Sequence, residues 1–278
     1  MILIIIFTYY ALEFLKELPD AKGVSLGFSN ISENNINLTP LNPSLIPDFI
    51  SLNFGTQNFA LLANYYLFGF SLPFKNIKTG FLWIRTQIDE IPEYPFLEEN
   101  DTIPKLKTGE FSSIEEAFLI PFKFKNLNLA FQFKIINKRF KDLKGKGIGF
   151  DLGFKKDFKL KGINTYLGIS LLDPFGTKIL WNRGSEDKEN IKILTFLTFK
   201  KNLKFISLAL SGKIGYDIEL LYSSGMEIKI KDIFSILAGY DREPRFGAGL
   251  VFKNFEIYYS LRIHELGLIE VINLSIKK

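Results

Sequence analysis

An alternation of apolar and polar residues is the feature that most restricts the fold of this 278-residue chain. It is clearest over residues 127–135, where Leu127, Leu129, Phe131, Phe133 and Ile135 alternate with Asn128, Ala130, Gln132 and Lys134. It returns over residues 148–155, where Ile148, Phe150, Leu152 and Phe154 alternate with Gly149, Asp151, Gly153 and Lys155. Period two predicts β-strands, because successive side chains of a strand point to opposite faces. No helical pattern follows that could cover the apolar face, so we expect a sheet closed on itself with that face in lipid.

Fourteen segments carry this strand pattern, and an even number suits a closed barrel of the bacterial outer membrane. We therefore predict an all-β fold, a 14-stranded antiparallel transmembrane β-barrel over residues 48–278. Residues 215–222 can hold a further strand segment. The predicted strands are Phe49–Gly55, Tyr65–Phe74, Gly80–Ile88, Glu115–Phe124, Leu127–Asn137, Ile148–Lys155, Ile163–Leu172, Ile191–Lys200, Phe205–Ile214, Gly225–Lys231, Phe234–Tyr240, Phe246–Phe252, Phe255–Ile263 and Ile269–Lys277.

The connections between these strands alternate in length. The joins after odd-numbered strands include the long ones, Asp89–Ile114, Lys138–Gly147, Asp173–Asn190 and Gly215–Ser224, whereas most other joins are a few residues long. Outer-membrane barrels have short periplasmic turns and longer outer loops. With the N-terminus in the periplasm, the long joins would all lie outside.

The composition agrees with a barrel and excludes several kinds of site. Phenylalanine and tyrosine number 29 and 11, as expected where aromatic residues face lipid. The chain has no cysteine and one histidine, which argues against thiolate chemistry and against a zinc site. We expect no metal and no cofactor. The net charge of +5 is spread along the sequence and predicts no nucleic-acid partner.

Residues 1–47 form the only long stretch without strand pattern. Their apolar start, Met1–Leu15, resembles the core of a signal peptide but lacks a basic beginning and a cleavage site. It is either the remnant of a signal or a part of the mature protein. A short helix is predicted around Tyr10–Glu17, ended by Asp20, Gly23 and Gly27. A barrel of fourteen strands is roughly 28 Å wide, too wide for side chains to fill, so we expect residues 1–47 to plug the lumen.

Several short motifs, in this order and spacing, resemble the PorV/PorQ family of outer-membrane proteins. They are Glu13–Lys16, Asp20–Gly27, Asn42–Leu45, Gly149–Gly153, Leu167–Ser170, Leu237–Tyr240, Gly247–Leu250 and His264–Gly267. The resemblance implies a 14-stranded barrel like that of the FadL fatty-acid transporters, with the N-terminal segment inside. Some members of the family serve as shuttle or docking components of type IX secretion. The chain departs from the family at Ser29–Ser32, where small residues are usual, and at its end, which is not aromatic.

Four charged residues are predicted to line the lumen: Lys134, Asp151, Glu256 and Arg262. They are candidates for tuning the passage of a solute, and the alternative is that they pair with one another inside the barrel. Phe175, Trp181 and Arg183 lie in a long outer join and are candidates for contact with a partner. The alternative for these three is turn chemistry with an interfacial tryptophan.

No catalytic site is predicted. His264 beside Glu265 has acid–base potential, but a loop residue next to a tight turn is the simpler interpretation. The acidic stretch Glu93–Glu99 lacks the spacing of a calcium loop, so we expect a solvated loop. The sequence shows no nucleophile–base pair and no nucleotide motif. An outer-membrane lipase is a remote alternative that would require a serine near His264.

The predicted function is therefore that of a non-enzymatic barrel in the bacterial outer membrane. Such a barrel would transport a hydrophobic solute or dock secreted protein cargo. Its expected partners are outer-membrane lipid and either secretion-system components or hydrophobic small molecules. The alternative is a structural envelope barrel that anchors partner proteins through its extracellular loops.

Overall fold

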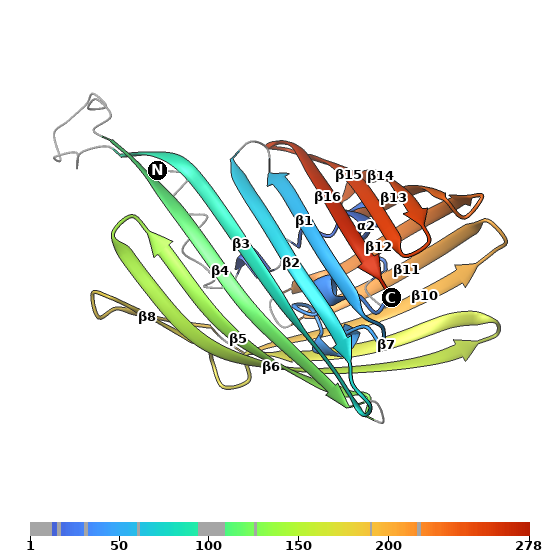
Figure 1. Cartoon of the computed structure of the whole chain (residues 1–278), viewed down its shortest axis with the longest axis horizontal. Coiled ribbons are helices and arrows are strands. Elements are labelled where there is room, and N and C mark those ends of the chain that lie inside the picture. The colour runs from blue at the N-terminus through green and yellow to red at the C-terminus, as the bar shows by residue number, and fades with distance from the viewer. Residues whose placement is uncertain are drawn as a thin grey trace.

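The computed structural model describes residues 13–15, 18–30, 33–59, 62–93, 109–124, 127–189, 191–215 and 218–278. Its strands form a closed antiparallel barrel of fourteen strands, and the ring closes where β1 pairs with β16 (Figure 1). The barrel strands are β1 Ser51–Phe59, β2 Ala63–Pro73, β3 Ile77–Glu93, β4 Gly109–Phe124, β5 Leu129–Phe140, β6 Leu143–Leu160, β7 Ile163–Leu172, β10 Lys192–Asn202, β11 Ile206–Gly215, β12 Ile218–Ile230, β13 Phe234–Asp241, β14 Glu243–Phe252, β15 Phe255–His264 and β16 Gly267–Lys277. All fourteen predicted strands are confirmed, and residues 218–222 of the extra segment predicted at 215–222 form the start of β12.

The alternation in the sequence separates the outer face of the barrel from the inner face. On β5, Phe133 and Ile135 are 51% and 47% exposed, whereas Gln132 and Lys134 are 0% and 2% exposed. The same contrast holds on β15 and β16, where Ile257 and other apolar residues face outward. The outer surface is therefore a nearly continuous apolar wall, while polar side chains collect inside.

Two of the four long joins were predicted wrongly, because the strands run beyond the apolar pattern. β5 and β6 continue to a two-residue turn at Lys141 and Asp142, and two residues separate β11 from β12. The ladder is held by backbone hydrogen bonds, so polar pairs such as Arg139 opposite Lys144 extend it where no apolar alternation marks it. The join between β3 and β4, residues 94–108, falls outside the described residues. The join at 173–190 contains a small hairpin, β8 Lys178–Trp181 and β9 Glu186–Lys188, which pairs with β6.

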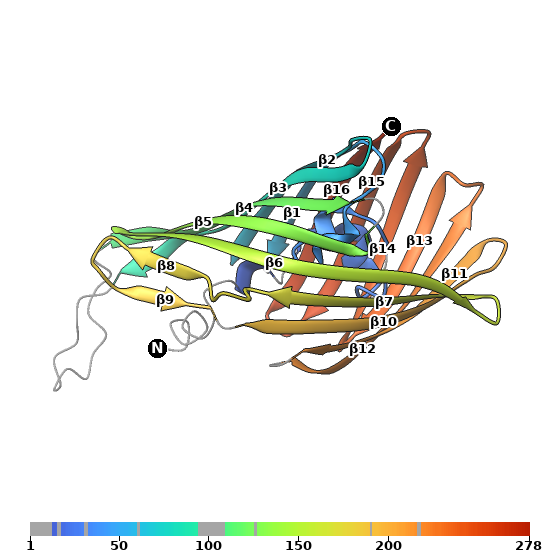
Figure 2. The ribbon, with the colours of Figure 1, turned by 90° about the horizontal axis from the view of Figure 1, so that it is seen from below.

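The described N-terminal residues 18–30 and 33–47 run through the inside of the ring (Figure 2). This segment contains α2 Ala21–Ser25, η2 Ile36–Leu38 and η3 Pro43–Leu45, and η1 Glu13–Leu15 precedes it. α2 contacts β13 to β16 on one side of the ring, whereas η2 and η3 contact β2 to β6 on the other. The segment therefore bridges opposite walls of the barrel.

The helix predicted at Tyr10–Glu17 lies largely outside the described residues, and Glu13–Leu15 forms one 3-10 turn. Of the residues predicted to end this helix, Gly23 was predicted wrongly, because it lies inside α2. Asp20 begins α2, because its Oδ2 accepts a hydrogen bond from the backbone N–H of Gly23 at 3.0 Å. No helix in the described part of the chain is long and apolar enough to cross a membrane.

Glycines on the inner face let the wall approach the segment closely. A Cβ added to Gly239 would lie 2.6 Å from the backbone nitrogen of Gly27, and one added to Gly247 would lie 2.8 Å from Ser25 Cβ. Side chains at these positions would overlap the N-terminal segment. Gly249, on the same strand as Gly247, faces the ring of Tyr258 and not the segment.

Candidate functional site

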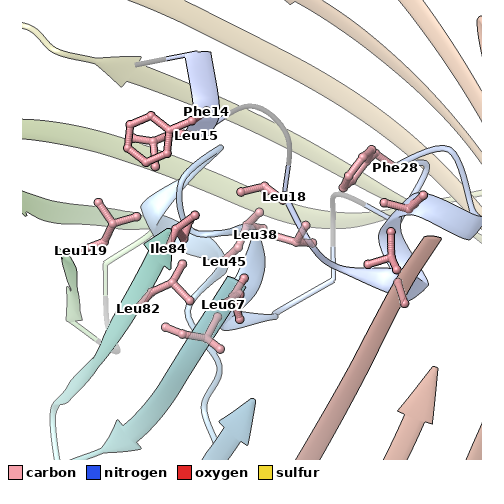
Figure 3. Close-up of a cluster of buried hydrophobic side chains, with 14 of the residues drawn as sticks. Phe14, Leu15, Leu18, Phe28, Leu38, Leu45, Leu67, Leu82, Ile84 and Leu119 are labelled. Atoms are coloured by element: carbon pink, nitrogen blue, oxygen red, sulfur yellow. The ribbon is translucent and has the colours of Figure 1, made fainter. Parts of the chain in front are cut away.

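The interior of the barrel has an apolar side that the N-terminal segment covers. Six apolar side chains of strands β2 to β5 belong to the buried core inside the barrel: Leu67, Leu82, Ile84, Ala117, Leu119 and Ile136. The segment packs its own apolar side chains on them, among them Leu38 and Leu45 (Figure 3). We call this apolar side of the lumen, which the N-terminal segment fills, the apolar chamber.

Two buried asparagines attach the segment to the wall through backbone groups. Asn273 on β16 donates from Nδ2 to the carbonyl oxygens of Pro19 at 2.6 Å and Phe54 at 3.2 Å, and its Oδ1 accepts from the N–H of Ala21. Asn42 in the segment donates to the carbonyl oxygen of Phe154 on β6 at 3.1 Å. These bonds satisfy polar groups that water cannot reach.

A network of ion pairs attaches the segment to the wall at a third place. Glu33 in the segment accepts from Lys22 at 3.1 Å and from Lys200 on β10 at 2.6 Å, and Lys22 lies 3.6 Å from Glu227 on β12. Burial alone would raise the pKa of Glu33 above its ordinary value of 4.5, but the charges of Lys22 and Lys200 outweigh burial and hold that pKa well below it. Burial likewise opposes the charge of Lys22, yet Glu33, Tyr258 and Glu227 raise its pKa well above 10.5.

This network predicts a pH-dependent attachment. Because folding lowers the pKa of Glu33, its contribution is complete above about pH 4.5 and falls as the pH drops below that value. Glu33→Gln should weaken the attachment of residues 18–30 by about 1–2 kcal/mol at neutral pH and remove this part of the acid dependence. Hydrogen–deuterium exchange of residues 18–30 between pH 4 and pH 7 measures both the strength of the attachment and its dependence on pH.

Asp20 must be separated from that effect, because burial raises its pKa despite hydrogen bonds from Asn37 and Gly23. Its titration therefore favours the folded segment on acidification, and only the difference between wild type and Glu33→Gln isolates Glu33. Glu186→Gln, which breaks the exposed pair with Lys178, is the matched control. Equal exchange of residues 18–30 in wild type and Glu33→Gln at every pH would contradict the prediction.

The four residues predicted to line the lumen fall in three places. Lys134 and Asp151 come together at 2.8 Å in a buried cluster that also holds Asp173, 2.6 Å from Lys134. Glu256 pairs with Lys277 at 2.6 Å. It borders a small polar cleft between the segment and strands β1, β15 and β16. Arg262 pairs with Glu243 at 2.6 Å. Their effect on the passage of a solute stays a prediction.

The three residues predicted to contact a partner lie in the β8–β9 hairpin or directly before it. Phe175 precedes the hairpin and is 84% exposed. Trp181 ends β8 and donates from Nε1 to Asp187 at 2.8 Å, while Arg183 lies exposed in the turn. Strands of four and three residues are too short to show an alternation, so no pattern in the sequence predicted this hairpin.

His264 is the last residue of β15, and its side chain contacts the turn that follows and the neighbouring strands. Its Nδ1 accepts from the N–H of Leu266 at 3.1 Å, its ring lies 5.3 Å from that of Phe59, and its Nε2 lies 3.9 Å from Glu243. Of the acidic stretch 93–99, only Glu93 belongs to the described residues. Over the described ranges, no group of three or more histidine, aspartate and glutamate side chains is placed to hold a metal.

The outer wall carries an apolar groove of about 670 Å³. Its lining comes from β1 to β4 and β16: Phe54, Gly55, Thr56, Tyr66, Leu67, Phe68, Phe81, Trp83, Phe118, Ile272 and Leu274. Most of these side chains point away from the lumen. Aromatic rings of neighbouring strands pack together here. The ring centroids of Phe54 and Phe68, for example, lie 5.2 Å apart.

Comparison with known proteins places the fold. No protein-family model matches the chain, and no curated protein matches it. Among solved structures, the toluene transporter TodX of Pseudomonas putida is 10% identical, covers 92% of this chain and 96% of its own, and superposes with a TM-score of 0.55. The monoaromatic hydrocarbon channel CymD is 10% identical, covers 97% of this chain and 98% of its own, and gives 0.54. The chain thus has the fold of outer-membrane β-barrel proteins.

Proposed function

We propose that this protein is a non-enzymatic β-barrel of the bacterial outer membrane that carries a hydrophobic solute through its lumen. The apolar outer wall supports a place in lipid. The two solved barrels of similar fold are, by their titles, a toluene transporter and a monoaromatic hydrocarbon channel, which supports a hydrophobic small molecule as the solute. We further propose that the barrel is of the PorV/FadL-like kind, with residues 1–47 as its plug.

The apolar chamber is the observation that carries this proposal. Leu82, Ile84 and Leu119 turn inward in a barrel whose other inner positions are largely polar. A purely structural barrel could bury polar side chains there, as it does elsewhere. An apolar lumen wall instead suits an apolar ligand, and the N-terminal segment fills it while no ligand is bound. Solute passage then requires the segment to move off this wall.

A disulfide can test that movement, because the chain has no cysteine of its own. Ser25→Cys with Gly247→Cys places two thiols at the contact where a Cβ on Gly247 would lie 2.8 Å from Ser25 Cβ, so a small shift of the segment gives disulfide geometry. In lipid vesicles, we expect the reduced protein to admit a hydrophobic dye and the oxidised protein to block it. Ser25→Cys alone and Gly247→Cys alone are the controls, the second because a Cβ on Gly247 by itself overlaps Ser25 and the Tyr259 carbonyl oxygen. Equal uptake in both redox states would contradict passage through the chamber.

Docking of secreted protein cargo is the second candidate, because Phe175 projects apolar surface beside the β8–β9 hairpin. In that case the vesicles would show no uptake, and secreted proteins or a secretion pore would co-purify with the barrel. A structural barrel that anchors envelope proteins through its outer loops is the third. Loss of partner capture on replacing Phe175, Trp181 and Arg183 together, with the barrel intact, would favour it.

A further inference from the structure

The barrel wall has a break on one edge of β6. β6 pairs with β8 from Gly145 to Ile148, where Ile148 lies opposite Lys178, and it pairs with β7 from Asp151, opposite Leu172, to Leu160. Residues 173–177 cross the interval between the two ladders, and Asp173 takes a left-handed backbone conformation with φ of 54°. A cavity of about 410 Å³ lies at this break. Its lining is Phe133, Ile148, Gly149, Phe150, Asp173, Phe175, Gly176 and Thr177.

Asp173, which lines this cavity, belongs to a buried cluster of charges with Lys134 and Asp151. The side chains of Lys134, Asp151 and Asp173 are at most 5% exposed, and the single ammonium group of Lys134 serves both carboxylates. The remaining donors to the two carboxylates are neutral: the Gln132 amide, the Thr177 hydroxyl and the backbone N–H of Asp173. With both carboxylates ionised, the cluster has a net charge of −1, and a buried charge without a counterion is costly.

Asp173 has one oxygen free for a ligand. Every hydrogen bond and ion pair that Asp173 makes through its side chain uses Oδ1, which accepts from Lys134 and Thr177. Within the described residues, Oδ2 has no such partner, although the side chain is 5% exposed and lines the cavity. The carboxylate can therefore accept a further donor from the cavity side.

The walls of the cavity are aromatic. The ring centroid of Phe150 lies 5.3 Å from the ring centroid of Phe133 and 6.1 Å from that of Phe175. Phe175 is 84% exposed, so it can close over a bound molecule. Aromatic faces around a carboxylate attract ammonium groups that carry apolar substituents, because the ring quadrupole and the negative charge act in the same direction.

We propose that this wall cavity is a binding site for an organic ammonium group, which pairs with Asp173 Oδ2 and packs against Phe133, Phe150 and Phe175. The ammonium can come from a lipid headgroup such as ethanolamine or from a free amine, because the recognising chemistry is the same. The site lies in the wall, apart from the apolar chamber, and does not depend on what the lumen carries.

The chain's own cations do not occupy this position. Lys134 is the sole ion-pair partner of Asp173 in the described part of the chain. Lys188 passes near Gly176 with its aliphatic stem, but it lies outside the lining of the cavity and is not paired with Asp173. Lys178 is turned to Glu186 at 2.8 Å.

Benzylammonium and benzyl alcohol provide a matched pair of probes, because they have the same ring and nearly the same size and differ in charge. We expect calorimetry or saturation-transfer NMR of the protein in an uncharged detergent at neutral pH to show benzylammonium binding about tenfold tighter than the alcohol. Asp173→Asn, which keeps an oxygen for Lys134 and Thr177, should abolish that preference. Phe175→Ala should weaken benzylammonium binding, whereas Phe205→Ala, an exposed ring in another turn, should not.

Two results would overturn the proposal. One is equal binding of the two probes to the wild-type protein. The other is an unchanged preference for benzylammonium in both Asp173→Asn and Phe175→Ala, in samples whose heat-modifiable gel mobility shows an intact barrel. Sodium chloride at matched ionic strength must not displace benzylammonium, since displacement would mark a general cation effect. Mass spectrometry of co-purified lipid then separates the sources: ethanolamine lipid enriched on wild type over Asp173→Asn indicates a headgroup, and no enrichment indicates a free amine.

Discussion

Replacing Gly239 with valine will release residues 18–30 from the inner wall and leave the barrel closed. A Cβ at this position would lie 2.6 Å from both the Gly27 nitrogen and the Ser25 carbonyl oxygen. These are backbone atoms, so a change of rotamer cannot relieve the overlap. We expect the attachment to weaken by about 3 kcal/mol, the upper part of the usual cost of overpacking.

Trypsin cleavage after Lys22 measures this effect, and it should accelerate about a hundredfold if cleavage follows the open population. Gly212→Val is the matched control, because a Cβ on Gly212 meets nothing within 4 Å. Heat-modifiable gel mobility reports whether the barrel itself is intact in both variants. A Gly239→Val barrel that protects Lys22 as well as wild type does would show that the close approach is not needed for attachment.

Replacing Lys134 with methionine will cost about 3–5 kcal/mol of unfolding free energy, because it leaves two buried carboxylates without their cation. Lys134 donates to Asp151 at 2.8 Å and to Asp173 at 2.6 Å, and the three side chains are at most 5% exposed. The same replacement at Lys178, which is 56% exposed in its pair with Glu186, should cost less than about 1 kcal/mol.

Urea unfolding in lipid vesicles measures both variants. Adding Asp151→Asn and Asp173→Asn to Lys134→Met should restore much of the loss, because the site then contains no charge. A Lys134→Met protein within about 1 kcal/mol of wild type would show that the cluster is hydrated or already neutral. Asp173→Asn alone should leave the free energy of unfolding nearly unchanged, since one carboxylate then matches one ammonium group.

The strands could be predicted well because their signal is local. Phe133 and Ile135 differ from Gln132 and Lys134 in polarity, and the geometry of a strand places them on opposite faces wherever it lies. The strand ends were less certain: Arg139 and Lys144 pair in the ladder although their sequence reads as a loop. Backbone hydrogen bonds maintain the ladder there, and these do not depend on side-chain polarity.

For the candidate sites, the sequence indicated which residues face the inside of the barrel but not which of them meet. The charge and position of Lys134 and Asp151 marked them as inner residues, but Asp173 read as part of a loop. It joins their cluster because β7 stops opposite Asp151 and the chain turns back to pair as β8. Likewise, the presence of a long non-strand segment was visible, whereas its attachment through Asn42 and Asn273 was not.

The sequence by itself determined the number of barrel strands, the face on which their side chains lie and the absence of thiol chemistry. These follow from residue identity and from a repeat of two residues. Only the tertiary structure decided that the segment around η2 and η3 lies against an apolar inner wall, that Glu33 joins Lys22 to Lys200, and that the wall breaks at β6. Such contacts join residues that are distant in sequence, and the register between strands sets them, which no local pattern encodes.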